Sequence, residues 1–156
     1  MKIYSNLTAL IGSTPLLEAQ RLTNVKKLNA KILLKLEALN PGGSVKDRVA
    51  LAMIEDAEKK GLLPPGGTII EATSGNTGIS LSAIGAYFGN PVHIFMPNWV
   101  SKERISLMQM YNATVTLISK EQGGFKRAIL EAEKYAKQND AFLSNQFENE
   151  DNILAH

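Results

Sequence analysis

The chain has 156 residues, of which 44% are hydrophobic and 21% charged, and its net charge is +2. These values are ordinary for a globular chain, and the length predicts one domain over residues 1–156. The small net charge gives no reason to expect a nucleic-acid partner, and no apolar run is long enough to span a membrane. The absence of cysteine excludes disulfides, thiolate catalysis and zinc–thiolate sites. Together with the lack of a signal-like start, it favours a cytoplasmic location.

The chain begins with a short lead-in, residues 1–10, and two extended pieces. Residues 14–18 form a turn into a short extended piece, and residues 21–30 are polar and turn-prone. Residues 31–37 alternate with Ile32, Leu34 and Leu36 on one face, which predicts a half-buried strand. Residues 45–60 then carry apolar side chains at helical spacing.

From residue 68 onward, strand-like and helix-like patterns alternate. The predicted strands are 68–72, 92–96, 114–118 and 141–143, and the predicted helices are 79–88, 101–111 and 125–138. Such alternation predicts an α/β fold in three layers, a parallel sheet with helices on both faces.

The segment Pro41-Gly42-Gly43-Ser44-Val45-Lys46-Asp47-Arg48 joins the strand at 31–37 to the helix at 45–60. Ser44 is a good N-cap, and Asp47 three residues on suggests an acidic variant of the capping box. Lys46 is the unusual residue, because a cation in the first turn faces the positive end of the helix dipole. A lysine held there is a candidate amine nucleophile. The alternative is an exposed lysine on a solvated turn.

A second segment, Thr73-Ser74-Gly75-Asn76-Thr77-Gly78, follows the strand at 68–72. It places hydroxyls, an amide and two glycines at the carboxyl end of a parallel strand, where open α/β sheets bind their ligands. The amides of the following helix suit a carboxylate or a phosphate. The alternative is an ordinary turn rich in glycine and asparagine.

Other chemistries lack their motifs. The sequence contains no dinucleotide-binding or P-loop glycine pattern and no nucleophile elbow. His93 lies in the middle of a predicted strand, which favours a packed residue over a base. No histidine–carboxylate pattern indicates a metal site.

Taken together, the two segments resemble the cysteine synthases (O-acetylserine sulfhydrylases), which are pyridoxal-phosphate enzymes of fold type II. The matching motifs are the following stretches, in the family's order: Ile11-Gly12-Ser13-Thr14-Pro15-Leu16, Asn40 to Arg48, Thr73 to Gly78, and Asn145-Gln146-Phe147-Glu148-Asn149. The resemblance covers essentially the whole of this chain and about half of the family's length.

The resemblance implies a role for each matching residue. Lys46 matches the lysine that bonds covalently to pyridoxal phosphate and takes the α-proton, and Asn76 matches the residue that holds the 3′ oxygen of its ring. The substrate's α-carboxylate would be bound by Thr73, Ser74, Gly75, Asn76, Thr77 and Gln146. The implied reaction is β-replacement, in which sulfide displaces acetate from O-acetylserine to give cysteine. The implied partners are a second copy in a homodimer and serine acetyltransferase.

The family's phosphate-binding loop, and the serine that faces the pyridine nitrogen, match nothing in this chain. We therefore expect an N-terminal half that holds the cofactor weakly and is inactive alone. Residues 14–37 would be edge strands that pair with the missing half, and their apolar edge would promote self-association. Residues 146–156 would be the truncated start of the next element.

Two other hypotheses stay open at this stage. One is a non-catalytic fragment or interaction module that keeps the fold. The other is a relative of cystathionine β-synthase or threonine dehydratase. Pro41 and the run from Gln146 to Asn149 favour cysteine synthase over those relatives.

Overall fold

The computed structural model describes residues 3–156, and its centre is a four-stranded parallel sheet of order β5-β4-β3-β6. The strands are β3 (Ile69–Ala72), β4 (Val92–Pro97), β5 (Thr114–Ile118) and β6 (Phe142–Leu143). Ile69 pairs with Val92 on one side and with Phe142 on the other, so β3 is a central strand. The predicted parallel sheet is confirmed, with strand ends within one or two residues of those expected.

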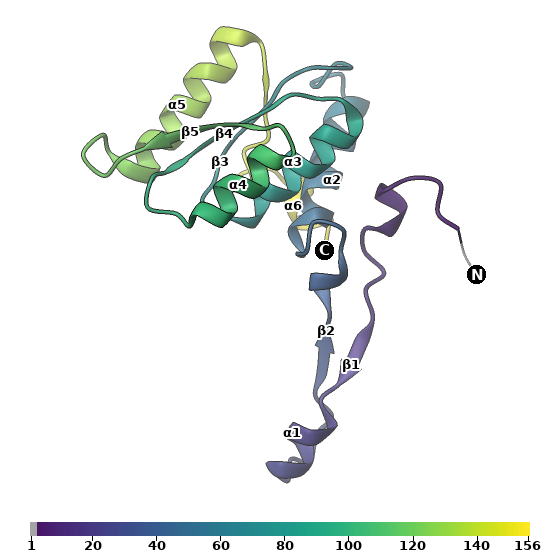
Figure 1. Ribbon diagram of the computed structural model, residues 1–156. Coiled ribbons are helices and arrows are strands. Elements are labelled where there is room, and N and C mark those ends of the chain that lie inside the picture. The colour runs from purple at the N-terminus through teal and green to yellow at the C-terminus, as the bar shows by residue number, and fades with distance from the viewer. Residues whose placement is uncertain (1–2) are drawn as a thin grey trace.

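Helices cover both faces of this sheet, as predicted (Figure 1). One face carries α2 (Lys46–Lys59), α3 (Asn76–Phe88) and α4 (Lys102–Met110), and the other carries α5 (Gly124–Asn139). Side chains alternate between two cores because successive residues of a strand point to opposite faces. Ile69 and Ile94 pack in the core under α2 and α3, whereas Ile70 and Phe95 pack against α5.

Residues 16–35 lie apart from this sheet domain (Figure 1). Strands β1 (Leu16–Glu18) and β2 (Leu33–Lys35) form their own antiparallel pair, and helix α1 (Gln20–Val25) joins them. Figure 1 shows this unit, which we call the ribbon (residues 16–35), projecting from the sheet domain with α1 at its far end. The short helices η1 (Thr8–Leu10) and η2 (Glu37–Leu39) flank it.

The structure corrects two expectations for this region. Residues 31–37 were predicted as a half-buried strand, but every residue of β2 is exposed because no layer covers it. Residues 21–30 were expected to be turn-prone, yet Gln20–Val25 is helical. Strands β1 and β2 pair with each other within this chain, and their pairing with a further segment stays a prediction.

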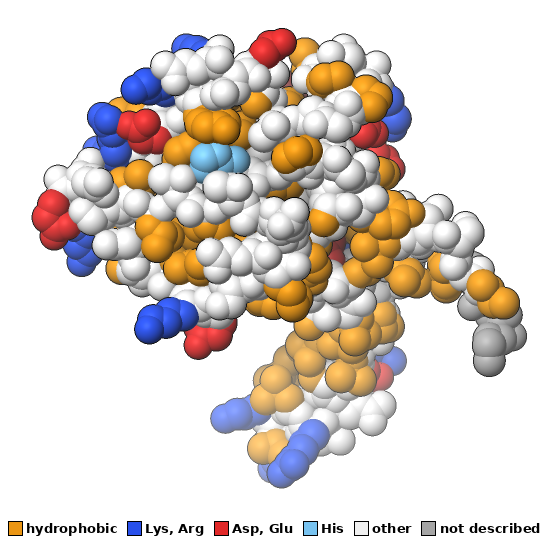
Figure 2. All heavy atoms as spheres, turned by 45° about the horizontal axis from the view of Figure 1, so that its top comes forward, with side chains coloured by type: hydrophobic (Ala, Val, Ile, Leu, Met, Phe, Trp, Pro, Cys, Tyr) orange, Lys and Arg blue, Asp and Glu red, His pale blue; other side chains and the backbone are white. Residues whose placement is uncertain are grey.

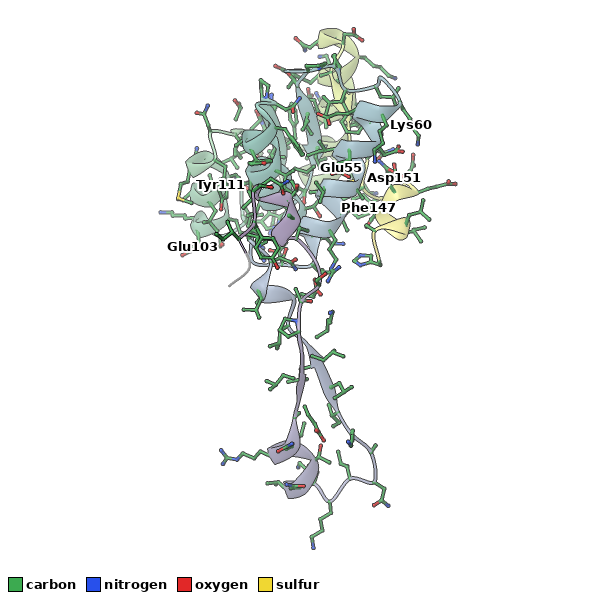
Figure 3. All side chains as sticks on the ribbon, turned by 90° about the vertical axis from the view of Figure 1, so that its right-hand side faces the viewer. Glu55, Lys60, Glu103, Tyr111, Phe147 and Asp151 are labelled. Atoms are coloured by element: carbon green, nitrogen blue, oxygen red, sulfur yellow. The ribbon has the colours of Figure 1, made fainter. Side chains whose placement is uncertain are left out.

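The C-terminal residues form the short helix α6 (Asp151–Leu154), which packs on α2. At this contact the Lys60 ammonium forms an ion pair with the Asp56 carboxylate at 2.5 Å. Figure 3 shows Asp151 close to Lys60. The hydrogen bond from Lys60 lowers the pKa of Asp56, and burial raises that of Asp151. That residues 146–156 are the truncated start of a further element stays a prediction.

Candidate active site

Lys46 is the first residue of α2, and its side chain is half-buried. Ser44 accepts a hydrogen bond from the Lys46 backbone N–H at 3.2 Å through its hydroxyl. Within residues 3–156 the Lys46 ammonium makes no ion pair. A lysine without a carboxylate partner is available to a ligand.

The expected capping box is not formed. The carboxylate of Asp47, only 1% exposed, accepts hydrogen bonds from the Gly42 backbone N–H at 2.5 Å and from the Ser80 hydroxyl at 2.6 Å. Asp47 therefore connects the segment 41–48, which we call the lysine loop, to α3. It does not cap the start of its own helix. The reason is that burial places it beside Ser80, and a buried carboxylate requires donors.

A second network of hydrogen bonds, centred on the Glu37 carboxylate, lies at the N-terminal side of the lysine loop. Arg48 donates to both oxygens of Glu37 at 3.0 Å, and the hydroxyl of Thr14 donates to Glu37 at 2.6 Å. Asn40 donates to Glu37 and accepts the Gly12 backbone N–H. The hydrogen bond from Arg48 lowers the pKa of Glu37 to about 2.

The second segment leaves the carboxyl end of β3 and becomes the first turn of α3. The Thr73 backbone N–H donates to the Phe95 carbonyl, and its hydroxyl accepts from the Gly75 backbone N–H at 3.3 Å. Helix α3 begins at Asn76, three residues earlier than predicted. The first N–H groups of a helix have no intrahelical acceptor, so this turn offers amide donors to an anion.

Gln146 reaches the second segment from the far end of the chain. Its side-chain oxygen accepts a 2.6 Å hydrogen bond from the Thr77 hydroxyl, and its side-chain nitrogen donates to the Ala72 carbonyl at 3.4 Å. Both Thr77 and Gln146 are buried, with 3% and 8% of their surface exposed. Residues 69 positions apart thus form one polar surface.

One open pocket brings together every residue predicted for the site. Its volume of about 370 Å³ is typical of small-molecule sites. It is lined by Val45, Lys46, Thr73, Ser74, Gly75, Asn76, Thr77, Arg104, Phe125, Gln146 and Phe147. Lys46 and Arg104 are its charged lining residues, and the lining contains no Asp or Glu. The pocket therefore favours an anionic ligand. The roles of the individual residues stay predictions.

Four lining residues were not among the predicted site residues: Val45, Arg104, Phe125 and Phe147. Arg104 donates to the Ser74 carbonyl at 3.3 Å, and the two phenylalanine rings meet edge to face at 6.3 Å. Arg104 and Phe125 follow β4 and β5, whose carboxyl ends lie at the same sheet edge as that of β3. Arg104 and Phe125 could therefore have been predicted from the sequence, since they follow neighbouring strands of the predicted parallel sheet.

His93 is a packed residue, as expected. Its ring stacks on Phe95 at 4.4 Å and hydrogen-bonds the Thr116 hydroxyl at 2.8 Å, and burial lowers its pKa. Among the described residues, no group of three or more His, Cys, Asp or Glu side chains could hold a metal ion. Within residues 3–156, no helix combines the length and apolar character needed to cross a bilayer.

Comparison with known proteins gives consistent results. The model of the pyridoxal-phosphate dependent enzyme family matches residues 7–156. Cysteine synthase B of Escherichia coli (strain K12) is 46% identical over 154 residues, which is 97% of this chain and 49% of that protein. The crystal structure of cysteine synthase from Entamoeba histolytica has a TM-score of 0.92 at 44% identity, covering 99% of this chain and 47% of that one. The crystal structure of O-ureido-L-serine synthase also has a TM-score of 0.92, at 37% identity, covering 99% and 48%.

A parallel α/β domain with a cationic, amide-rich pocket at the carboxyl edge of its sheet belongs to the class of ligand-binding α/β domains. With a family model that matches all but its first six residues, this chain belongs to the family of pyridoxal-phosphate dependent enzymes. The chain spans about half the length of the curated relatives it matches.

Proposed function

We propose that this chain supplies the N-terminal half of a cysteine synthase, a transferase in which sulfide replaces the acetate of O-acetylserine. The single observation that carries the proposal is the pocket that joins Lys46 to Asn76, the Thr73–Thr77 segment and Gln146. Relatives named cysteine synthase are 44–46% identical to this chain. Together these favour β-replacement over the other activities considered.

The residues present fit pyridoxal phosphate. Lys46 offers an amine that no carboxylate occupies, and Asn76, the first residue of α3, offers an amide to a ring oxygen. The absence of Asp and Glu from the lining suits a cofactor and a substrate that both carry negative charge. When bound, the cofactor supplies the electron sink for the reaction.

The protein's part is to position the substrate and move one proton. The Thr73–Thr77 segment and Gln146 would bind the α-carboxylate through hydroxyl and amide donors. The Nζ atom of Lys46 would then accept the α-proton. Phe125 and Phe147, whose rings contact each other in the pocket lining, would provide an apolar wall beside the reacting atoms. Such positioning is the main contribution of a protein to cofactor chemistry.

The proposal is tested by restoring the rest of the fold. A fusion of this chain to the C-terminal half of the E. coli cysteine synthase B should make cysteine from O-acetylserine and sulfide. This chain alone should hold pyridoxal phosphate weakly and make no detectable cysteine. A chain of 156 residues that is fully active alone would contradict the account, and so would a folded fusion that binds the cofactor without making cysteine.

A second candidate function is β-replacement with another nucleophile. The structure of O-ureido-L-serine synthase superposes as well as that of the Entamoeba cysteine synthase, with the same TM-score. Assaying the fusion with hydroxyurea and with sulfide separates the two, because the nucleophile is the only difference between the assays. The hypotheses of an interaction module or of a cystathionine β-synthase or threonine dehydratase relative predict no product in either assay.

The assembly and location of the protein belong to the same proposal. We propose a homodimer in the cytoplasm, with serine acetyltransferase as a partner, as the resemblance to cysteine synthases implies. The exposed leucines of the ribbon supply an apolar surface for association.

A further inference from the structure

Glu71 is a buried carboxylate in the middle of the apolar strand β3. Only 2% of its surface is exposed, and the neighbouring residues of the strand are buried and apolar. Within residues 3–156 it makes no ion pair. Burial raises the pKa of Glu71 above its ordinary value, and its hydrogen bonds oppose this shift only in part. A group of this kind requires a specific set of donors.

The donors come from the chain that follows β6. Strand β6 pairs with β3 over only two residues, Phe142 and Leu143. The Ser144 backbone N–H still donates to the Ile70 carbonyl at 3.0 Å, but no ladder bond follows. Beyond this point the Glu71 carboxylate, instead of a strand carbonyl, is the acceptor. It accepts hydrogen bonds from the Ser144 hydroxyl at 2.8 Å and from the Gln146 backbone N–H at 3.0 Å. Its other oxygen accepts the Ala72 backbone N–H at 2.8 Å.

This contact decides where Gln146 lies. With its backbone held at Glu71, the Gln146 side chain spans the end of β3 and reaches the Thr77 hydroxyl at 2.6 Å. We propose that Glu71 is a positioning residue, which fixes the 144–146 segment at the end of β3 and so places Gln146 in the pocket. The proposal rests on the proposed function only in treating that segment as the substrate-binding one.

A carboxylate suits this task better than its neutral isostere. Its two oxygens accept three donors, two from backbone N–H groups and one from a hydroxyl. Glutamine has the same shape but a single acceptor oxygen, so its amide NH₂ would face a donor. In Glu71→Gln the NH₂ would face either the Ala72 N–H or the two donors of the 144–146 segment, which share one oxygen. Glu71→Leu has no acceptor at all, so it leaves the Gln146 N–H buried without a partner.

The test is amide hydrogen exchange of the full chain, followed by NMR without any ligand. In Glu71→Leu we expect the Gln146 amide to exchange at least tenfold faster, while the Ile69 amide, bonded to the Pro91 carbonyl at the other end of β3, keeps its wild-type rate. The matched control is Asp47→Ala, which removes a second buried carboxylate that accepts a backbone N–H. It should speed exchange at Gly42 and leave Gln146 unchanged.

Two results would overturn the proposal. One is an unchanged rate at Gln146, and the other is an equal acceleration at Gln146 and Ile69, which would make Glu71 a general stability residue. If Glu71→Leu does not fold, Ser144→Ala removes one donor and keeps the carboxylate. It should speed exchange at Ser144 and Gln146 at least threefold, again without a change at Ile69, and unchanged rates at both would overturn the proposal.

A binding measurement separates this proposal from the proposed function. In the fusion protein, Glu71→Leu should raise the Kd for the amino-acid substrate at least tenfold and leave the covalent cofactor on Lys46 unchanged. Faster exchange at Gln146 with an unchanged Kd would contradict the substrate-binding role of Gln146, while the hold of Glu71 on the segment would stand.

Discussion

The sheet domain and the ribbon contain equally apolar strands that have opposite surroundings. All four residues of β3 are buried, whereas Leu16, Leu17, Leu33 and Leu34 of the ribbon keep 45–59% of their surface exposed. Figure 2 shows hydrophobic side chains along the projecting unit. An apolar pattern therefore predicts a strand in both places, but a second layer decides whether that strand is buried.

The candidate site belongs to the first of these regions. Its polar groups stand on elements whose other side chains fill the two cores, so the elements cannot shift without opening a cavity. Between the ribbon and the sheet domain lies the ion pair of Glu37, the first residue of η2, with Arg48 of α2, two residues after Lys46. The comparison can be tested region by region.

The largest effect is expected in the sheet core. Ile94 in β4 has no exposed surface, so Ile94→Ala should lower the free energy of unfolding by about 2–5 kcal/mol through lost burial and a cavity. Leu34→Ala in the ribbon should cost less than about 0.5 kcal/mol. Urea titrations of the two variants compare the regions directly, and equal costs would mean that the ribbon is packed in solution.

The next effect concerns the pocket. Thr77→Val keeps the shape of the side chain and removes the hydroxyl that bonds Gln146. In the fusion protein it should weaken amino-acid binding by about 1–3 kcal/mol, because the buried Gln146 side chain loses the donor that holds it beside the Thr73–Thr77 segment. Isothermal titration measures this affinity, and covalent cofactor on Lys46 is the control. An unchanged affinity would show that the segment is structural only.

Most of the sheet domain could be predicted from sequence, because its apolar periods repeat and its loops carry glycine and proline. Helix α1 could not, since its Leu22 and Val25 are exposed and show no buried face. Gly75, Thr77 and Gly78 around Asn76 have weak helix propensity. The sequence therefore predicted a loop where the structure has the first turn of α3.

The site residues were predicted from sequence motifs. The structure adds the hydrogen bonds that hold these residues in place. Asp47 was read as part of a capping box, but its donors Gly42 and Ser80 come from contacts that only the folded chain makes. Glu71 gave a signal that was not used, since an acid in the middle of the apolar run 69–72 implies buried donors.

A smaller effect is expected at the joint between the two regions. The pKa of Glu37 is lowered to about 2 from 4.5, so the carboxylate stabilises the folded state above pH 4.5 and loses this effect as the pH falls toward 2. Both side chains keep about a fifth of their surface exposed (23% for Arg48 and 20% for Glu37), so we expect about 1–2 kcal/mol. Glu37→Gln should be less stable than the wild type at pH 7, and the difference should shrink below pH 4. A constant difference would contradict the pKa assignment.

The smallest effect on stability is expected for the ribbon surface. Leu17 and Leu34 are cross-strand partners with about half of their surface exposed, so replacing both by serine should leave the unfolding free energy unchanged within about 0.5 kcal/mol. It should nevertheless reduce self-association, measured by sedimentation velocity over a range of concentrations. A wild-type chain that is monomeric throughout would contradict the role of this surface.

The central claim is that Lys46 is the group that holds the cofactor, and borohydride trapping followed by peptide mass spectrometry tests it most directly. In the fusion protein incubated with pyridoxal phosphate, we predict a reduced cofactor adduct on the peptide that contains Lys46 and none in Lys46→Ala. Lys59→Ala, which alters an exposed lysine at the other end of α2, is the matched control and should trap as much as the wild type. Equal trapping in Lys46→Ala, or an adduct located on another lysine, would contradict the account.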